Sequence, residues 1–228
     1  MVKAQTTSQA SSKKPKASRK GKEPLTRDRI AMTALDLIEK IGLEAFSTRR
    51  LGAALGCEAM ALYNHYPSKD AVLDAVVERM MRKLTVPPHD PRGWPERART
   101  FARSYRALSR MHPHAIPLAA TRRFNTTQSL TFLDDVFRAF SEDGLSPKET
   151  LYVFRTVANF CNGTVLDELA GLARASTPEQ PEWPSNKHPH LLAVAPFMSP
   201  THADDVFEVG LSVILDGLVR QVGAWRMG

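Results

Sequence analysis

Polar and basic side chains suited to contacting DNA gather on two short segments, residues 48–55 and 58–65, which are separated by Gly56. Ser47 is placed to cap the first of these expected helices, and Pro67 ends the second. Two short helices joined by a Gly-containing turn form a compact unit that can place its second helix in a major groove. Many helical hairpins share this layout, so the spacing alone also fits a plain helical hairpin.

Two His-x-His pairs are the second candidate for site chemistry, His112 with His114 and His188 with His190. Imidazoles at this spacing can bind Zn²⁺ or Ni²⁺. Each pair also brackets a helix-breaking proline, which favours an interpretation as ordinary loop histidines. We therefore expect no metal ion and no other cofactor.

Motifs of common enzyme classes are missing from the sequence, including a Gly-rich phosphate loop, Gly-x-Ser-x-Gly, His-Glu-x-x-His and Cys-x-x-Cys. We therefore expect no enzymatic activity. Cys57 and Cys161 are too few for a disulfide framework and are expected to be reduced thiols. No apolar run approaches the ~18 residues that span a bilayer, and no secretory signal is visible, so we expect a cytoplasmic protein.

The positive charge is confined to one end of the chain. The net charge is +7, and residues 1–22 contain seven of the 31 basic residues and no acid, which leaves 24 basic against 24 acidic residues elsewhere. A segment so poor in large apolar residues is expected to be disordered. Its role is open between a solubilising tail and an arm that follows DNA phosphates or enters a minor groove.

The rest of the sequence follows a helical period and shows no strand pattern, which predicts an all-α protein. Helices are expected over about 26–42, 48–55, 58–65, 69–84, 95–108, 130–140, 147–173 and 201–222. Prolines break residues 112–117, and six prolines mark 176–200 as irregular. The expected organisation is a tail over 1–22, a three-helix helix-turn-helix domain over 23–86 and a larger helical domain over 87–228.

Residues 47–51 (Ser-Thr-Arg-Arg-Leu), 55–58 (Leu-Gly-Cys-Glu) and 62–75 (Leu-Tyr-Asn-His-Tyr-Pro-Ser-Lys-Asp-Ala-Val-Leu-Asp-Ala) resemble the signature of the tetracycline-repressor (TetR) family. The resemblance covers 26–84 and continues, more weakly, at 142–145 and 159–168. It implies a homodimeric transcriptional regulator, usually a repressor, that binds palindromic operator DNA. A small ligand in the second domain would move the two heads apart. A non-specific DNA-packaging protein and a helical adaptor are the alternatives.

The resemblance also implies DNA contacts by residue. The positions concerned are Thr48, Arg49, Arg50, Ala59, Met60, Ala61, Tyr63, Asn64, His65 and Lys69. Thr48, Tyr63 and His65 are expected at phosphates, and Lys69 at a phosphate beside a helix N-terminus. Arg49 is expected at a phosphate or a guanine edge, and Asn64 at an adenine or the backbone.

The run Ala59-Met60-Ala61 departs from a polar reading face. We hypothesise that these side chains read thymine methyl groups and DNA shape, with few hydrogen bonds to base edges. The alternative for Met60 is packing in the core.

The second domain is expected to dimerise through its last two long helices, because each has a wide apolar face. The faces comprise Leu151, Phe154, Val157, Ala158, Cys161, Val165 and Leu169 on one helix, and Val206, Val209, Val213, Ile214, Leu218 and Val222 on the other. A pocket for a mostly apolar effector is expected among Phe101, Tyr105, Phe132, Phe137, Phe154, Asn159 and Phe160. Leu118 stands near the position of a histidine that helps tetracycline repressors hold a metal-bound drug, which disfavours that ligand.

Overall fold

The structure, a computed structural model, describes residues 24–122, 126–175, 188–197 and 200–227. Within these ranges the chain forms helices and loops and no strand, so the all-α prediction is confirmed. The head consists of α1 (Arg27–Ile41), α2 (Thr48–Leu55), α3 (Ala59–Tyr63) and α4 (Lys69–Met81). The body consists of α5 (Trp94–Met111), α6 (Ile116–Thr121), α7 (Thr127–Glu142), α8 (Pro147–Ala175), α9 (Pro189–Val194), the 3-10 turns Ala195–Phe197 and Pro200–His202, and α10 (Ala203–Met227). The expected tail lies outside the described residues.

The helices of the head begin where hydroxyl side chains cap them. Thr26, Ser47 and Ser68 each accept a hydrogen bond from a backbone N–H in the first turn of α1, α2 and α4. The inner faces of the four helices then meet in one apolar core. Its most deeply buried members include Ile30, Ile38, Leu51, Leu62, Val72, Val76 and Met80. This core fixes the orientation of α2 and α3, which carry the expected DNA contacts.

Two helices of the head are shorter than the sequence predicts. The N–H groups of His65 and Tyr66 both donate to the Leu62 carbonyl at 2.9 Å, which closes α3 two residues before the expected end. Lys83 and Leu84 likewise continue α4 only as turns, bonded three residues back to Met80 and Met81. Tight terminal turns of this kind satisfy the last carbonyls of a helix without prolonging it.

Two short helices, α6 and α9, lie in segments whose prolines predict irregular structure. In α6 and α9 the proline lies in the first turn, where the missing N–H and the fixed φ cost nothing. The expectation of irregular structure over 112–117, and over the described part of 176–200, was therefore wrong in part. The prolines begin these helices and do not interrupt them.

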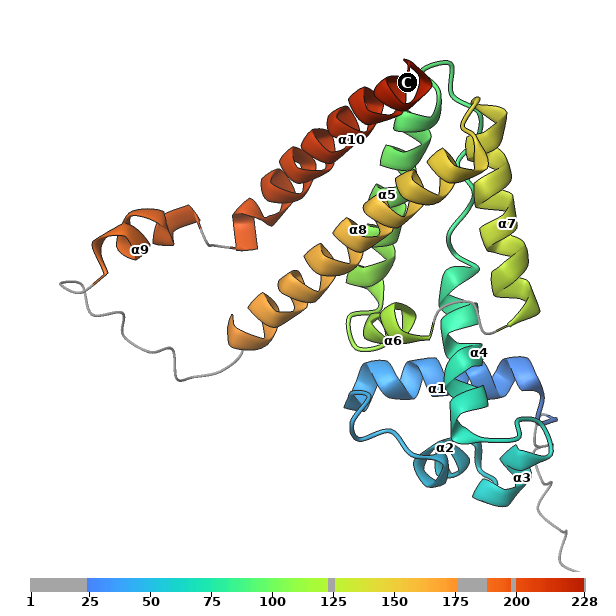
Figure 1. The fold of residues 1–228 in the computed structure, drawn as a ribbon. Helices are drawn as coiled ribbons and strands as arrows, with labels where there is room; N and C mark the ends of the chain where they lie inside the picture. The colour runs from blue at the N-terminus through green and yellow to red at the C-terminus, as the bar shows by residue number, and fades with distance from the viewer. Residues whose placement is uncertain (1–23, 123–125, 176–187, 198–199, 228) are drawn as a thin grey trace, which may run out of the picture.

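The body is a bundle in which α8 is central, and it packs against α5, α7 and α10. Figure 1 shows α8 and α10 running side by side along a diagonal, while α4 rises from the head toward α6 and α7. The buried Arg97 side chain donates to the carbonyls of Pro87 and Ala139 and pairs with Asp143. It therefore ties the segment that follows the head to the bundle.

Candidate DNA-binding face and ligand cavity

The turn between α2 and α3 depends on two glycines. Gly56 has φ 68°, a left-handed conformation that glycine adopts without strain. A Cβ on Gly52 would lie 2.9 Å from the Cys57 carbonyl oxygen and 3.1 Å from the Ala59 nitrogen. Because only glycine permits this approach, Gly52 sets the distance between α2 and the start of α3.

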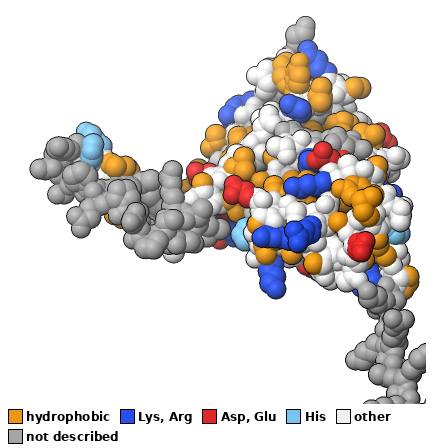
Figure 2. Space-filling model, turned by 90° about the horizontal axis from the view of Figure 1, so that it is seen from below, with side chains coloured by type: hydrophobic (Ala, Val, Ile, Leu, Met, Phe, Trp, Pro, Cys, Tyr) orange, Lys and Arg blue, Asp and Glu red, His pale blue; other side chains and the backbone are white. Residues whose placement is uncertain are grey.

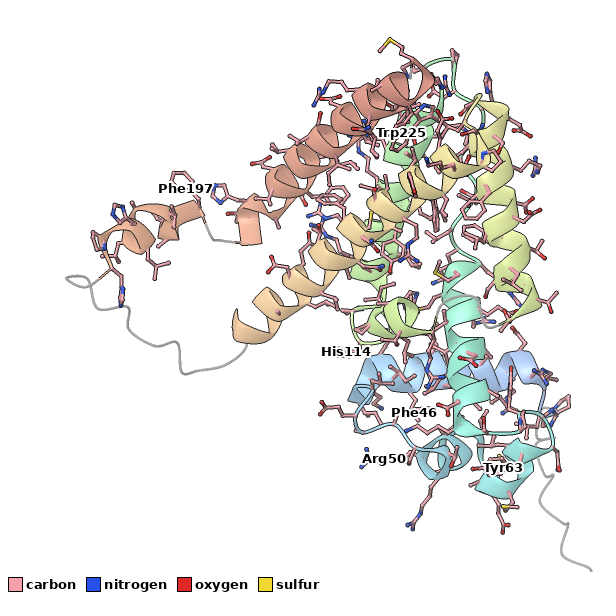
Figure 3. All side chains as sticks on the ribbon, in the orientation of Figure 1. Phe46, Arg50, Tyr63, His114, Phe197 and Trp225 are labelled. Atoms are coloured by element: carbon pink, nitrogen blue, oxygen red, sulfur yellow. The ribbon has the colours of Figure 1, made fainter. Side chains whose placement is uncertain are left out.

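The side chains predicted to contact DNA lie on the lower end of the head. Figure 3 shows Arg50 and Tyr63 at this end, on α2 and α3 respectively, and Figure 2 shows Lys and Arg side chains on the face seen from below. Arg49, Asn64 and Lys69 are also exposed, while Thr48, Ala59, Ala61 and His65 are half-buried. The Met60 side chain is 71% exposed, so it does not pack in the core.

The basic residues of this face differ in whether their side chains already make hydrogen bonds within the protein. Arg50 donates to the Ala45 carbonyl at 2.9 Å, and Lys69 donates to the Phe46 carbonyl at 3.1 Å. Arg49 has no hydrogen-bond or ion-pair partner among the described residues. Its guanidinium is therefore the most readily available cation at the start of α2.

The body contains an apolar cavity of about 50 Å³, here called the inner cavity. It is lined by Met81, Phe101, Tyr105, Ala119, Phe132, Phe154, Ala158, Cys161 and Asn162. The Tyr105 hydroxyl donates to Asn162 Oδ1 at 2.7 Å. Burial raises the pKa of the Cys161 thiol to about 12, so the lining carries no ionised side chain near neutral pH.

Four of the seven predicted pocket residues meet at this cavity: Phe101, Tyr105, Phe132 and Phe154. The other three lie elsewhere. Phe137 packs edge-on against Phe154 at 5.2 Å, Phe160 stacks on Phe207 at 5.6 Å, and Asn159 is exposed.

Sequence reasoning missed Asn162, which supplies the polar atom that Asn159 was expected to supply. The periodicity of α8 contained the signal. Asn162 lies eight residues after Phe154, on the same inward face, whereas Asn159 lies five residues after it and points away. Met81 and Ala119 were also missed, because they come from α4 and from the unexpected α6.

Helix α6 is attached to the head at both ends. At its start, the Glu39 carboxylate accepts hydrogen bonds from the backbone N–H groups of His114 and Ala115. At its end, the Arg122 guanidinium pairs with Asp70 and with Asp74, the latter at 3.1 Å. Since Ala119 of α6 lines the inner cavity, the cavity is linked to α1 and α4 of the head.

Helices α8 and α10 bury one face and expose another apolar face. On α10, Phe207, Leu211 and Leu215 are buried, whereas Val206, Val209 and Val213 are each 64% exposed. On α8, Leu151 and Leu166 are exposed to 44% and 47%. The apolar stripe predicted for α10 therefore divides between the core, where its members Leu218 and Val222 lie, and the surface, where its three exposed valines lie.

Within the described residues, the four histidines of the two His-x-His pairs lie apart from any cluster of metal ligands. His112 Nε2 lies 2.8 Å from Lys83 Nζ, His114 Nδ1 lies 2.7 Å from the Glu39 carbonyl, and His188 and His190 are exposed. In the described part of the chain, no group of three or more His, Cys, Asp or Glu side chains is arranged to hold a metal ion. No helix in these same ranges is long and apolar enough to cross a membrane.

Two family models match the chain. The model described as bacterial regulatory proteins, tetR family, matches residues 30–76. The model described as tetracyclin repressor-like, C-terminal domain, matches residues 87–222. The first match contains α2 and α3, and the second contains nearly all of the inner cavity's lining.

Individual proteins agree with this assignment. The tetracycline repressor protein class A from transposon 1721 of Escherichia coli is 32% identical over 199 residues, which are 84% of this chain and 89% of that protein. A solved structure of a possible TetR family transcriptional regulator from Streptomyces coelicolor has a TM-score of 0.74 and 29% identity, covering 85% of this chain and 98% of the other. The Streptomyces coelicolor TetR family protein ActR, solved in complex with actinorhodin, has a TM-score of 0.73 and 27% identity, covering 88% and 100%. The chain belongs to the TetR family of ligand-responsive transcriptional regulators.

Proposed function

We propose that this protein is a repressor that binds a palindromic operator as a homodimer and is released by a small, mostly apolar effector. The observation that carries the proposal is the exposed face of α2 and α3 at the end of the head. It presents Arg49, Tyr63 and Asn64 to solvent on helices that a shared core holds rigidly. A rigid helix with exposed polar side chains suits reading of a major groove.

The exposed Met60 side chain gives the recognition helix an apolar contact surface. Met60 projects into solvent between Ala59 and Ala61, so the first turn of the helix offers apolar contacts. Such contacts suit thymine methyl groups. We propose an operator whose half-sites place A·T pairs opposite Met60. A footprint dominated by essential G·C pairs at these positions would contradict this.

The homodimer would form through α8 and α10. The Val206, Val209 and Val213 side chains form an exposed apolar row along α10, and Leu166 is exposed on the adjoining helix α8. Exposed apolar rows of this kind on adjacent long helices mark protein–protein contacts. Two copies joined here would present two heads, as a palindrome requires.

The effector would occupy the inner cavity. Relatives solved with a bound small molecule, such as ActR in complex with actinorhodin, support a ligand-binding role. Met81 is the last residue of α4 and Lys69 the first, so a ligand against Met81 acts on a helix that also reaches the DNA face. A ligand that contacts Ala119 would also act on α6, which is bonded to the head at both ends. The polar lining groups are the Tyr105 hydroxyl, the Asn162 amide and an un-ionised thiol. This donor set suits an organic effector that needs no bound metal. We place this activity in the cytoplasm, where operator DNA lies.

The test is fluorescence-anisotropy binding to the DNA upstream of the protein's own gene, at stated salt and with competitor DNA. Competitor-resistant binding that weakens about tenfold in Arg49→Ala would support the proposal, because a good base contact contributes ~1–3 kcal/mol. Arg92→Ala is the matched control, since it removes an exposed arginine of the body. Binding that competitor DNA abolishes would favour non-specific packaging. Absence of binding, there and in a genome-wide selection of fragments, would favour an adaptor.

A further inference from the structure

A second pocket adjoins the inner cavity and shares part of its wall. This outer pocket holds about 240 Å³ and lies between α4 and the first half of α7. Its polar lining consists of Glu78, Arg82, Gln128, Ser129, Thr131 and Asp135. Met81 and Phe132 line both spaces, so these two side chains form the partition between them.

Size indicates that neither space suffices alone. Small-molecule sites usually hold ~300–1,000 Å³, whereas the inner cavity holds about 50 Å³. Together the two spaces approach the lower end of that range. The partition is also of a kind that moves readily, because Met81 is an unbranched, flexible side chain and Phe132 is only half-buried. Rotation of these two side chains would join the spaces into one elongated site.

The two spaces differ in charge. The inner cavity is lined by aromatic and apolar groups with no ionised side chain. The outer pocket contains two carboxylates, Glu78 and Asp135, against one guanidinium, Arg82. One end of a bound molecule would therefore lie in an uncharged environment and the other in one with an excess of negative charge.

The hydrogen bonds of the outer pocket show which groups are still available. Arg82 is held by Glu78 Oε1 at 2.5 Å and by Gln128 Oε1 at 2.8 Å. Asp135 Oδ1 accepts from Arg138 at 2.8 Å. The second carboxylate oxygens of Glu78 and Asp135 accept no hydrogen bond from any residue in the described ranges. Each carboxylate is thus paired with an arginine through one oxygen, while its second oxygen remains available to a ligand.

We propose that the effector is a two-part molecule with a flat, uncharged aromatic portion in the inner cavity and an ammonium-bearing arm in the outer pocket, facing Glu78 and Asp135. The inference rests on the proposed function, in which the inner cavity receives an effector, and it specifies that effector's chemical class. An ammonium arm suits two carboxylates with free acceptors, whereas a carboxylate arm would meet like charge.

The test uses three naphthyl probes that differ only at the arm: 2-(1-naphthyl)ethylamine, 2-(1-naphthyl)ethanol and 1-naphthylacetate. Their affinities for the full chain are measured by isothermal titration calorimetry at neutral pH. We expect the amine to bind about fivefold more tightly than the alcohol, as for a partly exposed ion pair, and the carboxylate to bind most weakly. The preference should shrink in Asp135→Asn, because Glu78 alone then faces the arm. It should persist in Asp134→Asn, which removes the same charge from a neighbouring residue that does not line the pocket.

Equal affinities, tighter binding of the carboxylate, a preference that is undiminished in Asp135→Asn, or no binding of any probe would overturn the inference. If Asp135→Asn fails to fold, Glu78→Gln provides the same comparison. The effector role in the proposed function is tested separately, by adding each probe to the protein–DNA complex and measuring release of DNA. A preference for the amine without release of DNA would support the two-part site and contradict only the effector role. Equal release by all three probes would support the effector role and overturn the two-part site.

Discussion

The head and the body build their candidate sites in opposite ways. The DNA face uses residues close together in sequence, on α2, α3 and the start of α4, whose side chains point outward from the apolar core. The inner cavity uses residues from α4, α5, α6, α7 and α8, whose side chains point inward and are themselves part of the core. Function and stability are therefore separable in the head and coupled in the body.

The sharpest test of this difference compares Phe101→Ala with Met60→Ala. Phe101 is 6% exposed, and its truncation should lower the free energy of unfolding by about 3–5 kcal/mol, because it removes an aromatic ring from the core. Met60 is 71% exposed, and its truncation should change that energy by about 0.5 kcal/mol or less. Urea unfolding at one fixed protein concentration measures both. Similar losses in the two variants would contradict the separation.

A second comparison concerns ion pairs. Asp143 is almost fully buried against Arg97, so Asp143→Ala leaves the buried guanidinium with only the half-exposed Glu142 carboxylate at 3.8 Å and should cost about 3 kcal/mol. In the head, Asp28 pairs with Arg79 at the surface, and Asp28→Ala should cost less than about 1 kcal/mol. The same unfolding experiment applies. A loss in Asp28→Ala as large as that in Asp143→Ala would show that the head, too, depends on its polar contacts.

A smaller effect is expected at the hydrogen bond inside the cavity. Tyr105→Phe removes the hydroxyl that donates to Asn162 and should lower the free energy of unfolding by about 1 kcal/mol. The same variant should change the affinity for a probe that hydrogen-bonds there, whereas Thr131→Val, in the outer pocket, should not. A change in stability without any change in affinity would assign this pair to packing alone.

The contrast between head and body also explains why the sequence predicts the DNA face better than the inner cavity. The head could be predicted almost completely, because caps such as Ser47 and Ser68, the turn at Gly56 and the apolar period are local signals. The cavity could be predicted only in part. Phe101 and Phe154 lie on helix faces with a clear apolar period. Ala119 lies on α6, a helix that the sequence does not predict because Pro117 indicates a break. Met81 lies at the end of α4, which belongs to the head. Some inward-facing residues line the inner cavity, whereas others pack on another side chain, as Phe160 does on Phe207. The difference depends on how helices distant in sequence cross, which the local pattern does not encode.

The last prediction concerns pH and the start of α8, where Ser146 and Glu149 form a capping box. The Ser146 N–H donates to Glu149 at 2.7 Å, and Arg226 donates to the same carboxylate at 3.1 Å. Arg226 chiefly, and then Ser146, hold the pKa of Glu149 at about 2, below its ordinary value of 4.5. The unfolded chain therefore binds more protons between these values, and the native state loses this stabilisation as pH falls from about 4.5 toward 2.

Glu149→Gln removes this contribution. The melting temperature of the wild-type protein should exceed that of the variant above pH 5 or so, and the gap should close on acidification through the window just given. Thermal unfolding of both proteins across this range measures it, with Glu44→Gln as a control that neutralises an exposed carboxylate of the head. A constant gap at every pH would mean that Glu149 acts through packing, and a gap that widens in acid would contradict the assigned sign. Because Arg226 lies near the end of α10, the result would also show whether the body's two long helices are joined through a charge.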